Sequence, residues 1–258
     1  MRSIDLNCDM GEVPEAIADG TQESLMPSLT SVNIACGGHA GDEGTMKTTI
    51  EQALRWKLAV GAHPGYPDRL NFGRVALNLP VEAVVESIFH QVRAFAEVAD
   101  RCGARLVHVK PHGELYNQAV HNRVLAQAIA TGVARCGRDV VMVGLAGSPM
   151  LDVFREAGFT VAAEAFADRQ YELDGTLRSR KFADALLRDP EDAGRQALRI
   201  VEKGSVIASD GSEVRVNAQT ICIHGDTPGA PAIAAAVART LREAGFELKA
   251  LAGAASRS

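Results

Sequence analysis

Short aliphatic or β-branched runs alternate with longer segments of helical periodicity along most of this sequence. The runs occupy residues 4–8, 31–36, 59–63, 106–110, 140–145, 160–166 and 220–224. This alternation is typical of β–α units, in which helices connect parallel strands. It therefore predicts an α/β protein built on seven parallel strands.

The segments between the runs carry helix start and stop signals. Asp42 precedes a helical pattern at residues 43–57, and Pro80 precedes one at residues 81–102. An oxygen-bearing side chain followed by proline, typical of a helix N-terminus, occurs at positions 148–149, 189–190 and 227–228. Glycines that can end helices in the left-handed conformation follow five stretches, at Gly103, Gly137, Gly158, Gly204 and Gly245.

One interruption of the pattern comes late in the chain. Residues 206–209 and 213–216 flank Asp210, Gly211 and Ser212, which is a hairpin signal. No linker or repeat divides the sequence, so we expect one domain over residues 1–258. The last residues, 253–258, are expected to form a flexible tail.

Two architectures accommodate seven β–α units in 258 residues, a closed barrel and an open doubly wound sheet. Polar residues follow nearly every predicted strand instead of gathering at one switch point, which favours the barrel. They are Asn7, Asp9, His39, His63, Lys110, His112, Glu164, Asp168, His224 and Asp226. We therefore predict a seven-stranded β/α barrel with its chemistry at the C-terminal ends of the strands.

Charge and hydropathy exclude several partners. The net charge is -5 and basic residues are scattered, so no nucleic-acid partner is expected. The longest apolar runs, such as residues 140–146, fall far short of the roughly 20 residues of a membrane span. Asp5 interrupts any secretory signal, and five cysteines without a C-x-x-C pair suit reduced thiols. We expect a cytoplasmic protein without disulfides.

Four segments concentrate the residues that could do chemistry. They read DLNCDMGE at 5–12, NIACGGHAGD at 33–42, GAHPGYPDR at 61–69 and VKPHGELYN at 109–117. Each ends a predicted strand, and glycine and proline let its backbone turn tightly. In a barrel these ends converge on one mouth, so the predicted catalytic residues are Asp9, His39, His63, Lys110 and His112. His90 and His121 fall in or near helices and are expected at the surface.

Two interpretations of this predicted site remain open. Asp9, His39 and His63 could hold zinc or iron with an open position for water. Without a metal, the same groups would relay protons and stabilise an oxyanion. The spacing does not decide, because each residue comes from a different strand.

Cationic side chains could bind anionic groups of a substrate. Lys110 is predicted to neutralise a carboxylate or developing charge, or else to be a surface lysine. Arg69 and Arg74 resemble an anion clamp, although Asp68 could pair with either. Cys8 and Cys36 are interpreted as small buried hydrophobic residues, and no nucleophilic role is assigned to them. No P-loop occurs, so ATP-driven chemistry would need another polypeptide.

The four segments, with EAFADR at 164–169 and IHGDTP at 223–228, resemble the LamB/YcsF family. The resemblance runs in order from Asp5 to Pro228. Gly38 stands where the family more often has an aromatic residue, Gly65 where it often has serine, and Glu114 where it often has alanine. Glu114 adds a charge, so the pocket is expected to differ there.

The resemblance implies a barrel similar to those of glycoside hydrolases and deacetylases. It also implies ATP-dependent opening of 5-oxoproline to L-glutamate by a 5-oxoprolinase completed by partner subunits B and C, which would use ATP with magnesium. The expected substrate-binding residues are Asn7, Arg69, Arg74, Glu164, His224 and Asp226. Two alternatives are kept: a metal-dependent deacetylase acting on an amide, and a non-catalytic scaffold that binds a metabolite.

Overall fold

A closed ring of seven parallel strands forms the centre of the computed structural model, which describes residues 2–227 and 229–252. The strands are β1 Ser3–Met10, β2 Ser31–Ala35, β3 Ala59–His63, β4 Leu106–Val109, β5 Val141–Leu145, β6 Thr160–Phe166 and β9 Thr220–Ile223. They pair in chain order, and β9 closes the ring by pairing with both β6 and β1. The predicted seven-stranded β/α barrel is confirmed.

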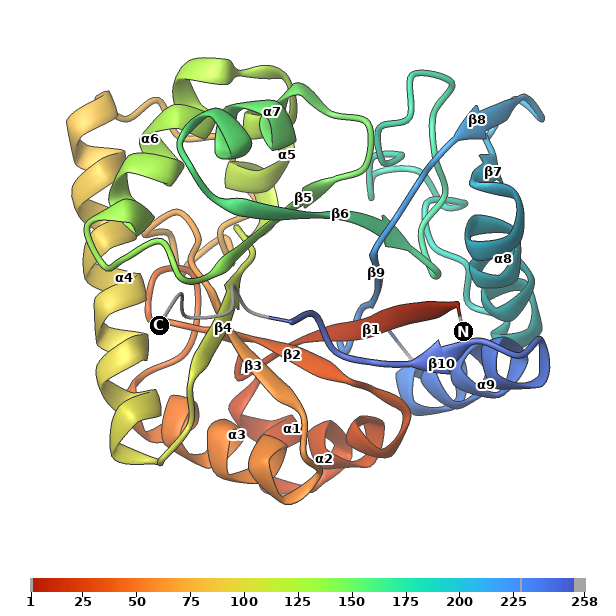
Figure 1. The fold of residues 1–258 in the computed structure, drawn as a ribbon, viewed down its shortest axis with the longest axis horizontal. Coiled ribbons are helices and arrows are strands. Elements are labelled where there is room, and N and C mark those ends of the chain that lie inside the picture. The colour runs from red at the N-terminus through yellow and green to blue at the C-terminus, as the bar shows by residue number, and fades with distance from the viewer. Residues whose placement is uncertain (1, 228, 253–258) are drawn as a thin grey trace.

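Helices surround the ring of strands, as Figure 1 shows, with α4 and α6 on one side and α8 and α9 on the other. The α-helices are α1 Pro14–Ala18, α2 Thr21–Leu25, α3 Glu43–Arg55, α4 Val81–Arg101, α5 Gly113–His121, α6 Arg123–Ala134, α7 Pro149–Glu156, α8 Pro190–Lys203 and α9 Ala230–Glu243, with a 3-10 turn, η1, at Met26–Ser28. Their apolar faces and the strands share one hydrophobic core.

The hairpin predicted late in the chain is confirmed. Strands β7 Ser205–Ile207 and β8 Glu213–Arg215 pair antiparallel outside the barrel. A further short strand, β10 Glu247–Leu248, pairs with the start of β1 and was not predicted. Its two residues are too few to give a periodic signal.

Most predicted helix boundaries agree with the structure. Asp42 caps α3, because its side chain accepts a hydrogen bond from the Thr45 amide, and Asp189 caps α8 in the same way. The five predicted glycine stops, Gly103, Gly137, Gly158, Gly204 and Gly245, all have positive φ.

Two predicted caps are wrong. The Ser148 hydroxyl donates to the Leu145 carbonyl instead of capping α7. Helix α9 begins at Ala230 after Gly229, so Thr227 does not cap it. Pro228 and the tail predicted at 253–258 lie outside the described residues.

No helix within the described ranges is long and apolar enough to cross a membrane. All five cysteines are free thiols. The assignment of residues 1–258 to one domain stays a prediction.

Candidate active site

A cavity of about 580 Å³ lies at the C-terminal ends of the strands, within the usual size of small-molecule sites. Five strands or the segments after them contribute its charged and polar lining. The lining includes Asp9, Glu12, His63, Arg74, Lys110, His112, Glu114, Tyr116, Arg169, Arg180, Lys181, His224 and Asp226. Residues far apart in sequence are therefore brought to one mouth.

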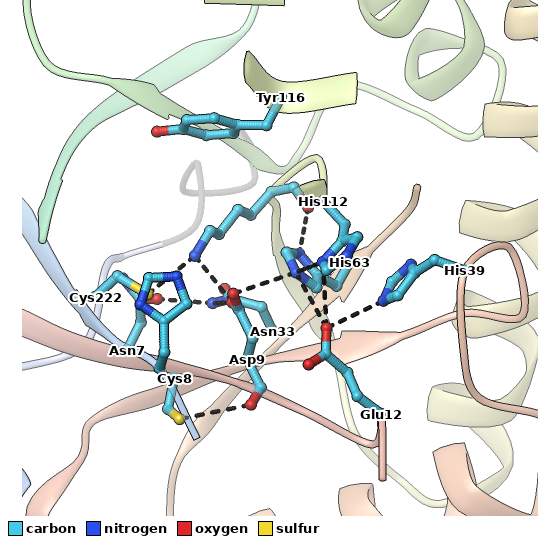
Figure 2. Close-up of polar contacts among 12 residues, drawn as sticks. Asn7, Cys8, Asp9, Glu12, Asn33, His39, His63, His112, Tyr116 and Cys222 are labelled. Atoms are coloured by element: carbon cyan, nitrogen blue, oxygen red, sulfur yellow. Dashed lines mark hydrogen bonds and ion pairs between the residues drawn. The ribbon is translucent and has the colours of Figure 1, made fainter. Parts of the chain in front are cut away.

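Glu12 lies at the centre of a group of imidazoles, as Figure 2 shows. Its Oε1 is 3.1 Å from His39 Nε2, 3.2 Å from His112 Nδ1 and 3.8 Å from His63 Nε2. Gly11, at φ 74°, turns the chain after β1 and aims Glu12 inward. Burial would raise the pKa of Glu12, but its contacts with His112 and His39 outweigh it and hold the pKa far below its usual value.

Burial also acts on the imidazoles around Glu12. It lowers the pKa of His39 to about 3 and lowers the pKa of His112, in each case against the opposing influence of Glu12. The rings are stacked on each other, with centroids 3.5 Å apart and planes 6° from parallel. Both imidazoles are therefore neutral near neutral pH.

Backbone carbonyls fix the tautomers of His63 and His112. His63 Nδ1 lies 2.8 Å from the Lys110 carbonyl oxygen, and His112 Nε2 lies 2.9 Å from that of Phe72. A carbonyl oxygen can only accept, so these nitrogens carry the protons. The other nitrogens, His63 Nε2 and His112 Nδ1, face each other 2.9 Å apart.

Asp9 and Lys110 form a buried ion pair beside these imidazoles. Lys110 Nζ lies 2.9 Å from Asp9 Oδ1, 3.0 Å from Glu164 Oε1 and 3.1 Å from Cys222 Sγ. Burial would lower the pKa of Lys110, but the negative charges of Asp9 and Glu164 outweigh it and raise that pKa well above its ordinary value. Burial would raise the pKa of Asp9, but His63 and Lys110 outweigh it and hold that pKa far below its ordinary value. Asp9 Oδ2 lies 3.4 Å from His63 Nε2.

Buried amides hold these charged groups from within the barrel. Asn33 Nδ2 donates to Asn7 Oδ1 and to Asp9 Oδ1, and Asn7 Nδ2 donates to Glu164 Oε1. His108 Nε2 lies 2.7 Å from Asn33 Oδ1. The carboxylates therefore sit on a fixed hydrogen-bonded layer, which preorganises the site.

Arginines provide a cationic part of the lining. Arg74 Nη2 lies 2.5 Å and Arg180 Nη1 3.1 Å from the same oxygen of Asp226. Two guanidinium groups thus share one carboxylate. Arg169 is buried, which lowers its pKa to about 10, and its guanidinium donates to the carbonyls of Ala185 and Arg178. The positive charge of this region can attract an anion.

His224 is held by a carboxylate of a neighbouring strand end. Its Nδ1 lies 3.0 Å from Asp168 Oδ1. Burial would raise the pKa of Asp168, but His224 outweighs it and lowers that pKa. The contact places the proton of His224 on Nδ1 and leaves Nε2 free to exchange a proton.

The structure brings together most of the residues predicted from the sequence and corrects others. Asp9, His39, His63, Lys110 and His112 adjoin one another, and Asn7, Glu164, His224, Asp226 and Arg74 lie in or beside the same cavity. Their catalytic and binding roles stay predictions. Arg69 does not line the cavity: it is exposed, and its guanidinium donates to the Gly37 carbonyl. Its predicted role as an anion clamp stays a prediction. Asp68 pairs with Asn71 and with neither arginine.

Two residues of the site were missed from the sequence. Glu12 stands in the first quoted segment, yet only the fold reveals that it contacts the imidazoles. Glu12 contacts all three imidazoles, His39, His63 and His112, whereas Asp9 contacts His63. Arg180 comes from the long connection between β6 and α8, whose course no periodicity predicts.

Within the described part of the chain, two groups of side chains have atoms close enough to share a cation. One is Glu12, His39, His63 and His112, and the other is Asp9, Cys222 and His224. In the second group the Lys110 ammonium already contacts Asp9 and Cys222. The first group is the better candidate for a metal.

The fold and the site define a β/α-barrel protein with a small-molecule cavity at the C-terminal ends of its strands. The chain belongs to the LamB/YcsF family, whose model matches residues 4–256. It is 48% identical over 249 residues to the A subunit of 5-oxoprolinase from Chloroflexus aggregans, covering 96% of this chain and 99% of that protein.

Solved structures agree with this assignment. The lactam utilization protein from Thermus thermophilus is 40% identical, with a TM-score of 0.89 over 96% of this chain and 100% of that one. A T48 deacetylase with substrate is 14% identical, with a TM-score of 0.51 over 96% of this chain and 87% of that one. At that identity the deacetylase shows a shared barrel fold alone.

Proposed function

We propose that this chain is the A subunit of an ATP-dependent 5-oxoprolinase, which opens the lactam ring of 5-oxoproline to give L-glutamate. The observation that carries the proposal is the near-complete coverage, at 48% identity, of a relative of that name. A cavity of about 580 Å³ lined by buried carboxylates and imidazoles supports it, because amide hydrolysis needs groups that move protons.

The difficult step in this reaction is attack on the lactam carbonyl. An unactivated amide resists water, and phosphorylation of the lactam oxygen would supply a better electrophile. The sequence has no phosphate-binding loop motif. We therefore assign the use of ATP and magnesium to partner subunits B and C in the cytoplasm, and ring opening to this barrel.

Asp9 is the proposed general base. Lys110 and Asn33 both donate to its Oδ1, which keeps the carboxylate ionised and leaves Oδ2 to accept a proton from the attacking water. His224, oriented by Asp168, is the proposed acid that protonates the ring nitrogen as the C–N bond breaks. With the lactam oxygen phosphorylated, the two steps add one water molecule across that bond and give an acyl phosphate, and a second water molecule then releases phosphate to leave glutamate.

The arginine side of the cavity is proposed to hold the anionic groups of the activated substrate. Arg74 and Arg180 share Asp226, so their combined charge exceeds that of their partner. Guanidinium groups bind carboxylate and phosphate in a bidentate manner. Glu114 also lines the cavity and would disfavour a second anion near it.

Reconstitution tests this function. Glutamate formation from 5-oxoproline and ATP is measured with this protein alone, with subunits B and C alone, and with the mixture. We expect glutamate only from the mixture. Equal rates with and without this chain would contradict the proposed function. Intact turnover by the mixture after Asp9, His39 and His112 are changed to alanine would show a scaffold, and hydrolysis of acetylated sugars by the chain alone, without ATP, would favour a deacetylase.

A further inference from the structure

Three electron-pair donors converge in the cluster around Glu12. His63 Nδ1 donates to the Lys110 carbonyl and His112 Nε2 donates to the Phe72 carbonyl, so these two nitrogens carry the protons. The other ring nitrogens, His63 Nε2 and His112 Nδ1, therefore present lone pairs towards the centre of the cluster. The Glu12 carboxylate oxygen is the third donor. Lone pairs 2.9 Å apart repel each other unless a positive charge lies between them.

The spacing of the three atoms matches the coordination shell of a small metal ion. The separations are 2.9 Å between His63 Nε2 and His112 Nδ1, 3.2 Å between His112 Nδ1 and Glu12 Oε1, and 3.8 Å between His63 Nε2 and Glu12 Oε1. The circle through three such points has a radius of about 2 Å, which equals the usual zinc–nitrogen and zinc–oxygen bond length. One ion can therefore contact all three.

His39 belongs to the second layer of this cluster. Its ring lies parallel to that of His112, 6° apart in plane and 3.5 Å apart in centroid. An imidazole binds a metal in the plane of its ring, and no point lies in both of two parallel planes. His39 Nε2 is 3.1 Å from Glu12 Oε1, so it is placed to donate to the carboxylate, and His39 does not line the cavity.

The local charge also favours a cation. Lys110 offsets one of the two charges on Asp9 and Glu164. Among the described residues, the charged or polar side chains that contact the Glu12 carboxylate are all imidazoles. A dication would compensate both this carboxylate and the remaining charge nearby.

We propose that Glu12, His63 and His112 bind one divalent metal ion, with Zn²⁺ the best-matched ion, and that a coordination position facing the cavity stays open. Two imidazoles and a carboxylate are a ligand set typical of catalytic zinc. The outer N–H groups of both imidazoles are bound by backbone oxygens, which is the arrangement that orients metal-binding histidines. His39 is a positioning residue that holds Glu12.

Binding of a metal ion by Glu12, His63 and His112 is inferred from this geometry alone, whereas a role of that ion in catalysis rests on the proposed function. In lactam opening, a dication at this position would polarise the carbonyl group of the substrate. Asp9, with Oδ2 3.4 Å from His63 Nε2, lies beside the open position as a base.

Metal binding is tested on the full chain without any activity assay. The purified protein is stripped with a chelator, titrated with Zn²⁺ by calorimetry and analysed by elemental mass spectrometry, and Co²⁺ is added separately for its visible spectrum. We expect about one Zn²⁺ per chain, and a Co²⁺ spectrum of four- or five-coordinate type. Absence of stoichiometric binding of both ions would overturn the proposal, even if the reconstituted enzyme is active.

Variants locate the site. Glu12→Gln and His63→Ala are expected to lower Zn²⁺ affinity more than 100-fold, and His39→Ala by about 10- to 100-fold, as for other second-layer partners of metal ligands. His90→Ala, an exposed imidazole on α4, is the matched control and should bind as the parent does. Unchanged affinity in Glu12→Gln and His63→Ala, with circular dichroism confirming the fold, would contradict this site.

Discussion

Lys110 shows how a buried position changes the chemical role of a side chain. The sequence predicts that it neutralises a group on the substrate or lies at the surface. In the structure it is buried, and it neutralises Asp9 and Glu164 of the protein itself. Its removal should therefore affect folding as well as turnover.

Lys110→Met tests this role. The substitution keeps a similar volume but leaves two buried carboxylates without their cation, which costs roughly 3–5 kcal/mol when a buried pair is broken. Urea unfolding at neutral pH should show a loss of that order. Lys47→Met, in an exposed pair on α3, is the control and should change stability little. A stable Lys110→Met protein with only a raised KM would instead support the predicted role of neutralising a group on the substrate.

His108 makes stability depend on pH. Burial lowers its pKa from 6.5 to about 3, so between these pH values the unfolded chain binds a proton at His108 that the folded chain does not bind. The free energy of unfolding should therefore fall as pH drops from 6.5 towards 3.

His108→Gln isolates this contribution. Relative to the parent, the variant should gain roughly 1 kcal/mol of stability for each pH unit below 6.5. Denaturant unfolding at pH 7, 6 and 5 measures the difference, and the exposed His90→Gln supplies the baseline. A parent–variant difference that does not change with pH would refute the buried, neutral state of His108.

Site residues could be predicted from the sequence where they lie at the C-terminal ends of strands, because a barrel brings those ends together. Asp9 and His63 lie at the C-terminal ends of β1 and β3, and His112 follows β4, so their meeting follows from topology. Glu12 comes two residues after β1, where Gly11 sets its direction, and no spacing rule predicts its contacts. That Arg69 lies outside the cavity lining was unpredictable for a related reason, because the sequence does not specify the course of its loop.

At the scale of elements, the strands were the most predictable part. Residues 59–63 and 160–166 agree with β3 and β6 end to end, because continuous apolar runs mark strands buried on both faces. Short elements such as α1, α2 and β10 escaped, since five or fewer residues carry too little periodicity. Their positions depend on packing against the barrel.

A glycine in β3 makes room for a polar ring inside the barrel. Gly61 pairs with His108 of β4, and a Cβ added at Gly61 would overlap the imidazole of His108. Gly61→Ala should therefore destabilise the protein by about 1–3 kcal/mol or more through overpacking. Chemical denaturation of Gly61→Ala, His108→Ala and the double variant measures the coupling. If the effects of the two single changes simply add, the close approach does not exist.

The first turn of α3 has a cap whose effect can be measured. Asp42 accepts from the Thr45 amide, and Thr45 Oγ1 accepts from the Asp42 amide. Asp42→Ala should cost about 1 kcal/mol, whereas Asp42→Asn keeps an oxygen acceptor and should cost less. Thermal unfolding compares the two. Equal losses would show that the capping hydrogen bond does not stabilise the helix.

For the whole molecule, the barrel explains why distant segments form one site. Parallel strands joined by outer helices place every C-terminal strand end at one mouth, so five of the six motifs line a single cavity, and His39 of the sixth contacts Glu12 beside it. The closed barrel was predictable from the spread of polar residues along the chain. The cationic side of the cavity was not, because Arg180 lies in a long connection whose course is set by contacts with Asp226.

The central claim is that this mouth performs the ring opening. Glutamate formation from 5-oxoproline and ATP by the reconstituted three-subunit enzyme, with Asp9→Asn in place of the parent chain, tests it most directly. Asp68→Asn, outside the cavity lining, is the matched control. Loss of a general base predicts a fall in kcat of about 10²- to 10⁴-fold for Asp9→Asn and parental rates for Asp68→Asn. A folded Asp9→Asn protein that supports the parental rate would contradict the account.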